Sequence, residues 1–107
     1  MLQLFGESLE FEWNEGNSEK NWKRHRVSIP ECEQVFFNKP LAVRLDPGHS
    51  SEEIRFFAFG KTDSGRRLAV VFTIRGGYLR VVSARDQSQR ERKTYEAHEK
   101  ENPEVQK

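Results

Sequence analysis

The spacing of apolar and polar residues changes along the chain, and each spacing predicts one kind of element. Residues 9–13 alternate apolar and acidic positions, which is typical of a short, half-buried strand. Asn14 can then cap a polar helix that runs to about Arg24. The run Ser28-Ile29-Pro30-Glu31 is a capping box with proline in the first turn, and it predicts a second helix that ends at residues 38–40.

From residue 41 the spacing becomes that of strands. Alternating or apolar runs occupy residues 41–45, 54–60, 67–75 and 78–84, and a charged helical segment follows from about 86 to 101. The Gly76-Gly77 pair predicts a tight hairpin, since both residues of a type I′ turn need positive φ angles. We therefore expect an α+β fold: a small, mainly antiparallel sheet of four to five strands, two N-terminal helices and one C-terminal helix. The domain is predicted to span residues 9–101, with tails at 1–8 and 102–107.

Strand parity indicates where a site could lie. Arg55, Phe57 and Phe59 share one face of their strand, and both faces of the sheet carry apolar residues. Helices are therefore expected to cover one face fully and the other in part. Four arginines would lie on the rim of the open part: Arg55, Arg75, Arg80 and Arg85.

The charge distribution favours a polyanionic partner. The chain has a net charge of +1, but residues 55–93 alone carry +7. Such a basic segment is typical of proteins that bind RNA or DNA, although an acidic protein partner would select the same pattern. The eight phenylalanines indicate a folded chain, and Cys32, the single cysteine, is predicted to lie in the core.

Several classes of function are not favoured. The chain has no glycine-rich phosphate loop and no His-x-x-x-His pair, and its three histidines are scattered, so no cofactor and no metal site are predicted. No signal peptide or membrane span is expected from the acidic start and the short apolar runs, and one cysteine excludes an internal disulfide. We expect a cytoplasmic protein that does not bind membranes.

The remaining chemistry suits the cleavage of RNA by its own 2′-hydroxyl. That reaction needs a proton acceptor, cations around the phosphorane and a proton donor to the departing 5′-oxygen, and it needs no metal. His25, beside Lys23 and Arg24, is the candidate for proton transfer, although a surface histidine at a helix C-terminus is an equally good interpretation. We predict catalytic roles for His25, Arg75 and Arg85, and phosphate binding by Arg55, Arg80, Lys23 and Arg24. Each arginine taken alone could instead be an ordinary solvated charge.

Two residues of the last helix are possible supporting residues. Glu91 and Tyr95 are four positions apart and share a helix face. The interpretation favoured by the sequence is that Tyr95 docks the helix and Glu91 pairs with a nearby arginine.

An ordered set of short motifs resembles the BrnT family of type II toxins. The motifs run from residue 11 to residue 96 and include Phe11-Glu12-Trp13-Asn14, His25-Arg26-Val27-Ser28, Glu53 to Arg55, Thr73-Ile74-Arg75-Gly76, Ser83-Ala84-Arg85 and Arg90-Glu91-Arg92. The resemblance implies a RelE-like fold, an endoribonuclease that arrests translation, and a BrnA-like antitoxin. It further implies two toxin and two antitoxin chains in the complex, with operator DNA bound only through the antitoxin. The competing hypothesis is a non-enzymatic module that binds RNA or a protein.

Overall fold

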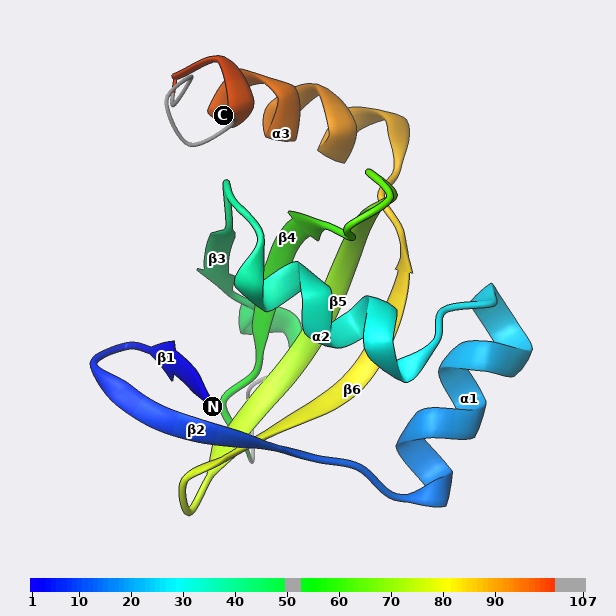
Figure 1. Cartoon of the computed structure of the whole chain (residues 1–107), viewed down its shortest axis with the longest axis vertical. Helices are drawn as coiled ribbons and strands as arrows, with labels where there is room; N and C mark the ends of the chain where they lie inside the picture. The colour runs from blue at the N-terminus through cyan, green and yellow to red at the C-terminus, as the bar shows by residue number, and fades with distance from the viewer. Residues whose placement is uncertain (50–52, 102–107) are drawn as a thin grey trace.

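The computed structural model describes residues 1–49 and 53–101. In this part of the chain, three α-helices accompany a six-stranded sheet with the order β1-β2-β6-β5-β4-β3 (Figure 1). The strands are β1 (Leu2–Leu4), β2 (Glu7–Glu12), β3 (Ala42–Leu45), β4 (Phe56–Lys61), β5 (Arg67–Arg75) and β6 (Tyr78–Asp86). The helices are α1 (Glu15–His25), α2 (Ile29–Phe37) and α3 (Gln89–Glu101), with a short 3-10 helix at Pro47–His49.

The sheet is larger than predicted and is mixed. Four of its five strand pairings are antiparallel, but β2 runs parallel to β6. The expectation of an N-terminal tail over residues 1–8 is wrong, because β1 pairs with β2 and places Leu2 in the core. A turn at Phe5 and Gly6, both with positive φ, joins the two strands. The predicted tail at 102–107 lies outside the described residues.

Local capping starts both N-terminal helices where the sequence predicts. The Asn14 side chain accepts from the backbone N–H of Asn17, and the Ser28 side chain accepts from that of Glu31. In each capping box the side chain of the third helical residue, Asn17 or Glu31, accepts a hydrogen bond from the backbone N–H of the cap residue. Arg26, in the left-handed conformation, ends α1.

The core lies between the sheet and the first two helices. Helix α1 packs on β6, and α2 packs on β4 and β5 (Figure 1). Burial of Cys32 raises the pKa of its thiol to about 12, so this cysteine is a core residue, as predicted, and not a thiolate nucleophile. The fully buried residues of this core include Leu9, Val35, Ala58, Leu68, Val70, Phe72, Leu79 and Ala84.

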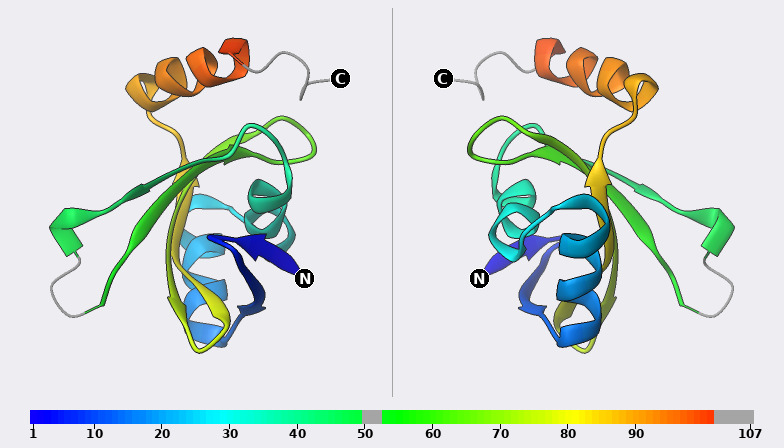
Figure 2. Two further views of the ribbon diagram at one scale, coloured as in Figure 1. Left: turned by 90° about the vertical axis from the view of Figure 1, so that its left-hand side faces the viewer. Right: turned by 90° about the vertical axis from the view of Figure 1, so that its right-hand side faces the viewer.

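In the part of the chain that the structure describes, the opposite side of the sheet, which we call the outer face, is covered at one end only. Its residues, placed there by strand register and alternation, include Arg44, Phe57, Phe59, Ala69, Val71, Thr73, Arg80 and Arg85. Helix α3 crosses the end of this sheet near the start of β5 (Figure 2). The described helices therefore cover one face and part of the other, and among residues 1–49 and 53–101 no helix covers the outer face toward the β5–β6 hairpin.

Candidate functional site

Charged side chains converge at the hairpin end of the outer face. The Arg75 Nη2 donates a hydrogen bond to the Glu53 carboxylate. That hydrogen bond is the main reason why the pKa of Glu53 lies below its usual value, and the positive charges of Arg75, Arg55 and Arg80 lower it further. We call these four residues the arginine–glutamate cluster.

The pairing of β5 with its neighbouring strands explains why the cluster forms. Arg75 ends β5 and pairs in register with Tyr78, while Arg80 on β6 pairs with Thr73. Glu53 lies three residues before the start of β4, and β4 is the strand that neighbours β5. The side chain of Arg75 is 72% exposed, so the cluster offers cationic groups to a ligand from solvent while keeping one carboxylate ionised.

Arg85 lies at the other end of the outer face. It lies five positions after Arg80 along β6, which corresponds to about 16 Å at the rise of a strand. Its guanidinium makes two hydrogen bonds to the Glu91 carboxylate, at 2.7 and 3.0 Å. The four arginines predicted on one rim are therefore divided, with three around Glu53 and Arg85 beneath α3.

The predicted residues of α1 lie in the helical layer on the other side of the sheet. His25 is the last residue of α1, and its backbone oxygen accepts a hydrogen bond from Arg66 at 2.9 Å. Lys23 pairs with Glu19 at 3.7 Å on the exposed surface of the same helix, and Arg24 is also exposed. The structure therefore brings none of the three together with Arg75 or Arg85, and their predicted roles remain predictions.

Arg66 fastens the end of α1 to the sheet. Its guanidinium donates to Asp86 at 2.7 Å, to Glu31 at 3.1 Å and to the backbone oxygens of His25 and Arg26. The hydrogen bonds from Arg66 to Asp86 are the main reason why the pKa of Asp86 lies below its ordinary value. Arg66, the cation that contacts His25, therefore has a structural role.

Helix α3 is held by residues spaced four apart. Glu91 pairs with Arg85, the buried Tyr95 donates its hydroxyl to the Pro40 oxygen at 2.6 Å, and Glu99 accepts from Arg67 and Lys61. The hydrogen bond from Arg85 is the largest factor that lowers the pKa of Glu91, to about 2, and burial raises the pKa of Tyr95. This geometry agrees with the docking interpretation of Glu91 and Tyr95.

Sequence reasoning missed an aromatic and cationic group in the middle of the outer face. The rings of Phe57 and Phe59 are stacked, with centroids 5.5 Å apart and an interplanar angle of 14°. The guanidinium of Arg44 lies over both rings, 5.5 Å and 5.2 Å from their centroids. Parity placed the two phenylalanines on one face, but the register of β3 was needed to add Arg44.

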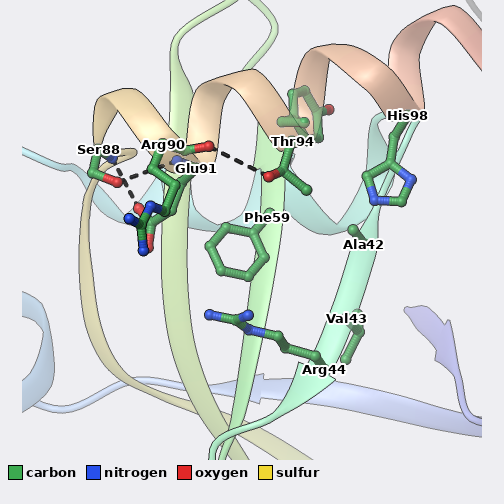
Figure 3. Close-up of a pocket in the computed structure, with 10 residues that line it drawn as sticks. Ala42, Val43, Arg44, Phe59, Ser88, Arg90, Glu91, Thr94 and His98 are labelled. Carbon is green, nitrogen blue, oxygen red and sulfur yellow. Dashed lines mark hydrogen bonds between the residues drawn. The ribbon is translucent and has the colours of Figure 1, made fainter.

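A pocket of about 600 Å³ opens between α3 and this aromatic group. Phe59 lies at its centre with the Arg44 side chain beneath, and Thr94 and His98 descend from α3 (Figure 3). The other lining residues are Ala42, Val43, Ser88, Arg90, Glu91 and Tyr95.

Two further features bear on the class of site. Among residues 1–49 and 53–101, no three or more His, Cys, Asp or Glu side chains are grouped so that they could hold a metal ion. None of the three described helices has the length and apolar composition needed to cross a bilayer.

Comparisons with known proteins give one family and one fold. The family model described as the ribonuclease toxin BrnT of type II toxin–antitoxin systems matches residues 13–91. The structure is similar to the crystal structure of the Brucella abortus ribonuclease toxin BrnT, with a TM-score of 0.54 and 21% sequence identity, over 78% of this chain and 99% of that chain. A comparison with curated protein sequences gave no match. At this identity the structural likeness supports the fold alone.

Proposed function

Because the chain belongs to the BrnT family of ribonuclease toxins of type II toxin–antitoxin systems, we propose that it is an endoribonuclease that cuts RNA at the arginine–glutamate cluster. The observation that carries this proposal is the hydrogen bond from Arg75 to the Glu53 carboxylate at the open end of the outer face, with Arg55 and Arg80 near enough for their charges to lower the pKa of Glu53. Glu53 was not among the catalytic residues expected from the sequence. It replaces His25 in our proposal because it lies beside the arginines.

In the proposed mechanism Glu53 is the general base. Its lowered pKa keeps it ionised at neutral pH, so it can accept the proton of the ribose 2′-hydroxyl. The 2′-oxygen then attacks the adjacent phosphorus, the bond from phosphorus to the 5′-oxygen breaks, and a 2′,3′-cyclic phosphate forms.

The arginines stabilise the charge that develops on the phosphate. Each guanidinium has five N–H donors in a planar arrangement, so Arg75 can contact Glu53 and a phosphate oxygen at once. Arg55 and Arg80 add positive charge from the neighbouring strands. These three cations can supply the stabilisation of the transition state that a metal ion supplies in other nucleases, and the mechanism is metal-independent.

The departing 5′-oxygen needs a proton donor. Tyr78 pairs in register with Arg75 and is 48% exposed, so we propose its hydroxyl for this role. His25, the proton-transfer residue expected from the sequence, lies beside Arg66 near Asp86 at the other end of β6, so our proposal does not give it this role.

The family supports a proposal for the cellular role. Cleavage of RNA would arrest translation, and a BrnA-like antitoxin would neutralise the toxin in a complex of two toxin and two antitoxin chains. Operator DNA would be bound only through the antitoxin. An acidic segment of the antitoxin that covers the arginine–glutamate cluster would be attracted by the same charges that attract RNA.

The proposal is tested with purified protein and RNA in excess EDTA. We expect cleavage with products that end in a 2′,3′-cyclic phosphate, growth arrest on expression in bacteria, and relief of that arrest by the co-expressed neighbouring antitoxin gene. Loss of cleavage in EDTA would contradict the metal-free mechanism. RNA that is bound with a steep salt dependence but left uncut would favour the non-enzymatic module.

A further inference from the structure

We infer that the pocket between β3, β4 and α3 binds one nucleobase of the RNA substrate, with the base stacked on Phe59. This inference rests on the proposed function, since it gives the same RNA a second contact on the same face of the protein. The pocket volume, about 600 Å³, lies within the range of pockets that bind small organic groups.

The centre of the pocket is built for stacking. Phe59 is partly exposed, and Phe57 supports its ring in a nearly parallel arrangement. The exposed Arg44 side chain presents its guanidinium to the two rings. Proteins that bind single-stranded RNA stack bases on aromatic rings and on arginine planes, and either surface is present here. An entering base can displace Arg44 from Phe59 and use the guanidinium as its second stacking partner.

The wall of the pocket offers polar groups to the edge of a base. The Thr94 hydroxyl donates to the backbone oxygen of Arg90 at 3.4 Å, which leaves its own oxygen able to accept. The His98 ring also lines the pocket from the next turn of α3 (Figure 3). These groups can form hydrogen bonds with a base without changing the fold of α3.

The position of the pocket favours RNA over a peptide. The cross-strand pair that contains Phe59 lies four residues along the sheet from the pair of Thr73 and Arg80. This offset corresponds to about 13 Å at the strand rise. A few nucleotides of single-stranded RNA can cover this distance on the outer face. Arg44 and Arg90 line the pocket and would lie beside the connecting phosphates. The base bound here would therefore be a few nucleotides away from the bond that is cut.

Binding of short 2′-O-methyl RNA, which cannot react, tests the inference by fluorescence anisotropy. We expect Phe59→Leu to weaken binding about tenfold, the size of effect produced by a lost base–aromatic stack, and Phe59→Tyr to bind like the unchanged protein. Phe37→Leu is the matched control, because Phe37 is a 53% exposed phenylalanine of α2, in the helical layer on the other side of the sheet. Thermal unfolding checks that each variant is folded.

A second measurement uses the unchanged protein and RNA in which single nucleotides are made abasic in turn. We expect one position to weaken binding about tenfold, and Phe59→Leu to remove that difference. Arg44→Gln, at an exposed position, should weaken binding to a smaller degree. If Phe59→Leu is unstable, the abasic series and Arg44→Gln still decide the question.

The outcomes separate the pocket from the cutting site. Equal binding by Phe59→Leu, or equal binding of all abasic RNAs, would overturn the inference even if the protein cuts RNA. An effect of Phe59→Leu on the affinity for the antitoxin, with RNA binding unchanged, would also overturn it and assign the pocket to a protein partner. A protein that shows the abasic effect but never cuts RNA would support the pocket and contradict the proposed function.

Discussion

Replacing Glu91 with glutamine is predicted to weaken the attachment of α3 in a pH-dependent manner. Glu91 accepts two hydrogen bonds from Arg85 and one from the backbone N–H of Ser88, and its pKa in the folded protein is about 2. Glutamine preserves the size of the side chain and its place in the helix cap but removes the charge. It also replaces one of the two oxygens that face Arg85 with an amide N–H donor, so it removes the ionic pair together with one of its hydrogen bonds.

The expected size follows from the pKa. A lowering from 4.5 to about 2 would correspond to about 3 kcal/mol at most, since each unit equals about 1.4 kcal/mol. The side chain of Arg85 is 37% exposed, so solvent screens part of this interaction. We expect a loss of about 1–2 kcal/mol in the free energy of unfolding at pH 7, which would lower Tm by about 4–15 °C in a domain of this size.

The dependence on pH has a definite sign. Because the folded pKa is lower than the unfolded one, the contribution of Glu91 is fully present above the ordinary glutamate pKa and is lost as the pH falls toward 2. The difference in stability between the unchanged protein and Glu91→Gln should therefore shrink between about pH 4.5 and pH 2.

Urea unfolding followed by circular dichroism at several pH values measures this difference. Glu96→Gln is the matched control, because Glu96 lies on the exposed side of the same helix and should change stability little. If Glu91→Gln and Glu96→Gln were equally stable at pH 7, or if their difference did not change on acidification, the ionic attachment of α3 would be refuted.

Three other predictions concern single side chains. Tyr95→Phe should lose about 1–2 kcal/mol, because the buried Pro40 oxygen loses its donor, and an unchanged urea midpoint would contradict this. Gly60→Ala should lose about 1–3 kcal/mol, since its Cβ would lie 2.8 Å from the Val35 Cγ1; full stability in thermal unfolding would show that the helix can shift. Arg75→Gln should reduce kcat/KM about 100-fold. It should also move the acidic limb of the pH–rate profile to higher pH, because the pKa of Glu53 rises when its hydrogen bond from Arg75 is lost, and a limb that stays in place would argue against Glu53 as the base.

Local signals predicted the helices well and the sheet in part. The capping box at Ser28 and Glu31 is contained in four residues, so the start of α2 follows from the sequence. The three residues of β1 carry no comparable signal, since this strand is stabilised by pairing with β2 and by burial of Leu2 among distant core residues. Sheet size was therefore underestimated.

The same difference between local patterns and tertiary contacts applies to the predicted site residues. Alternation along a single strand was enough to place Arg55 on the face of Phe57 and Phe59, but the pairing of β4, β5 and β6 was needed to place Arg75 and Arg80 on the same face. Alternation could not reveal that Glu91 would hold Arg85 beneath α3, because that contact depends on how the last helix turns back over the sheet. The cations beside His25 in the sequence likewise carried no information about which side of the sheet α1 would cover.

The most direct test of the account compares RNA cleavage by Glu53→Gln and His25→Gln in EDTA, under conditions where each enzyme molecule acts once. Our account predicts that Glu53→Gln lowers the rate of cleavage at least 100-fold, as expected when a general base is removed, while His25→Gln cleaves at nearly the original rate. Folding of both variants is checked by their thermal unfolding. A variant Glu53→Gln that cleaves normally, together with a large loss in His25→Gln, would contradict the assignment of the cutting site to the arginine–glutamate cluster.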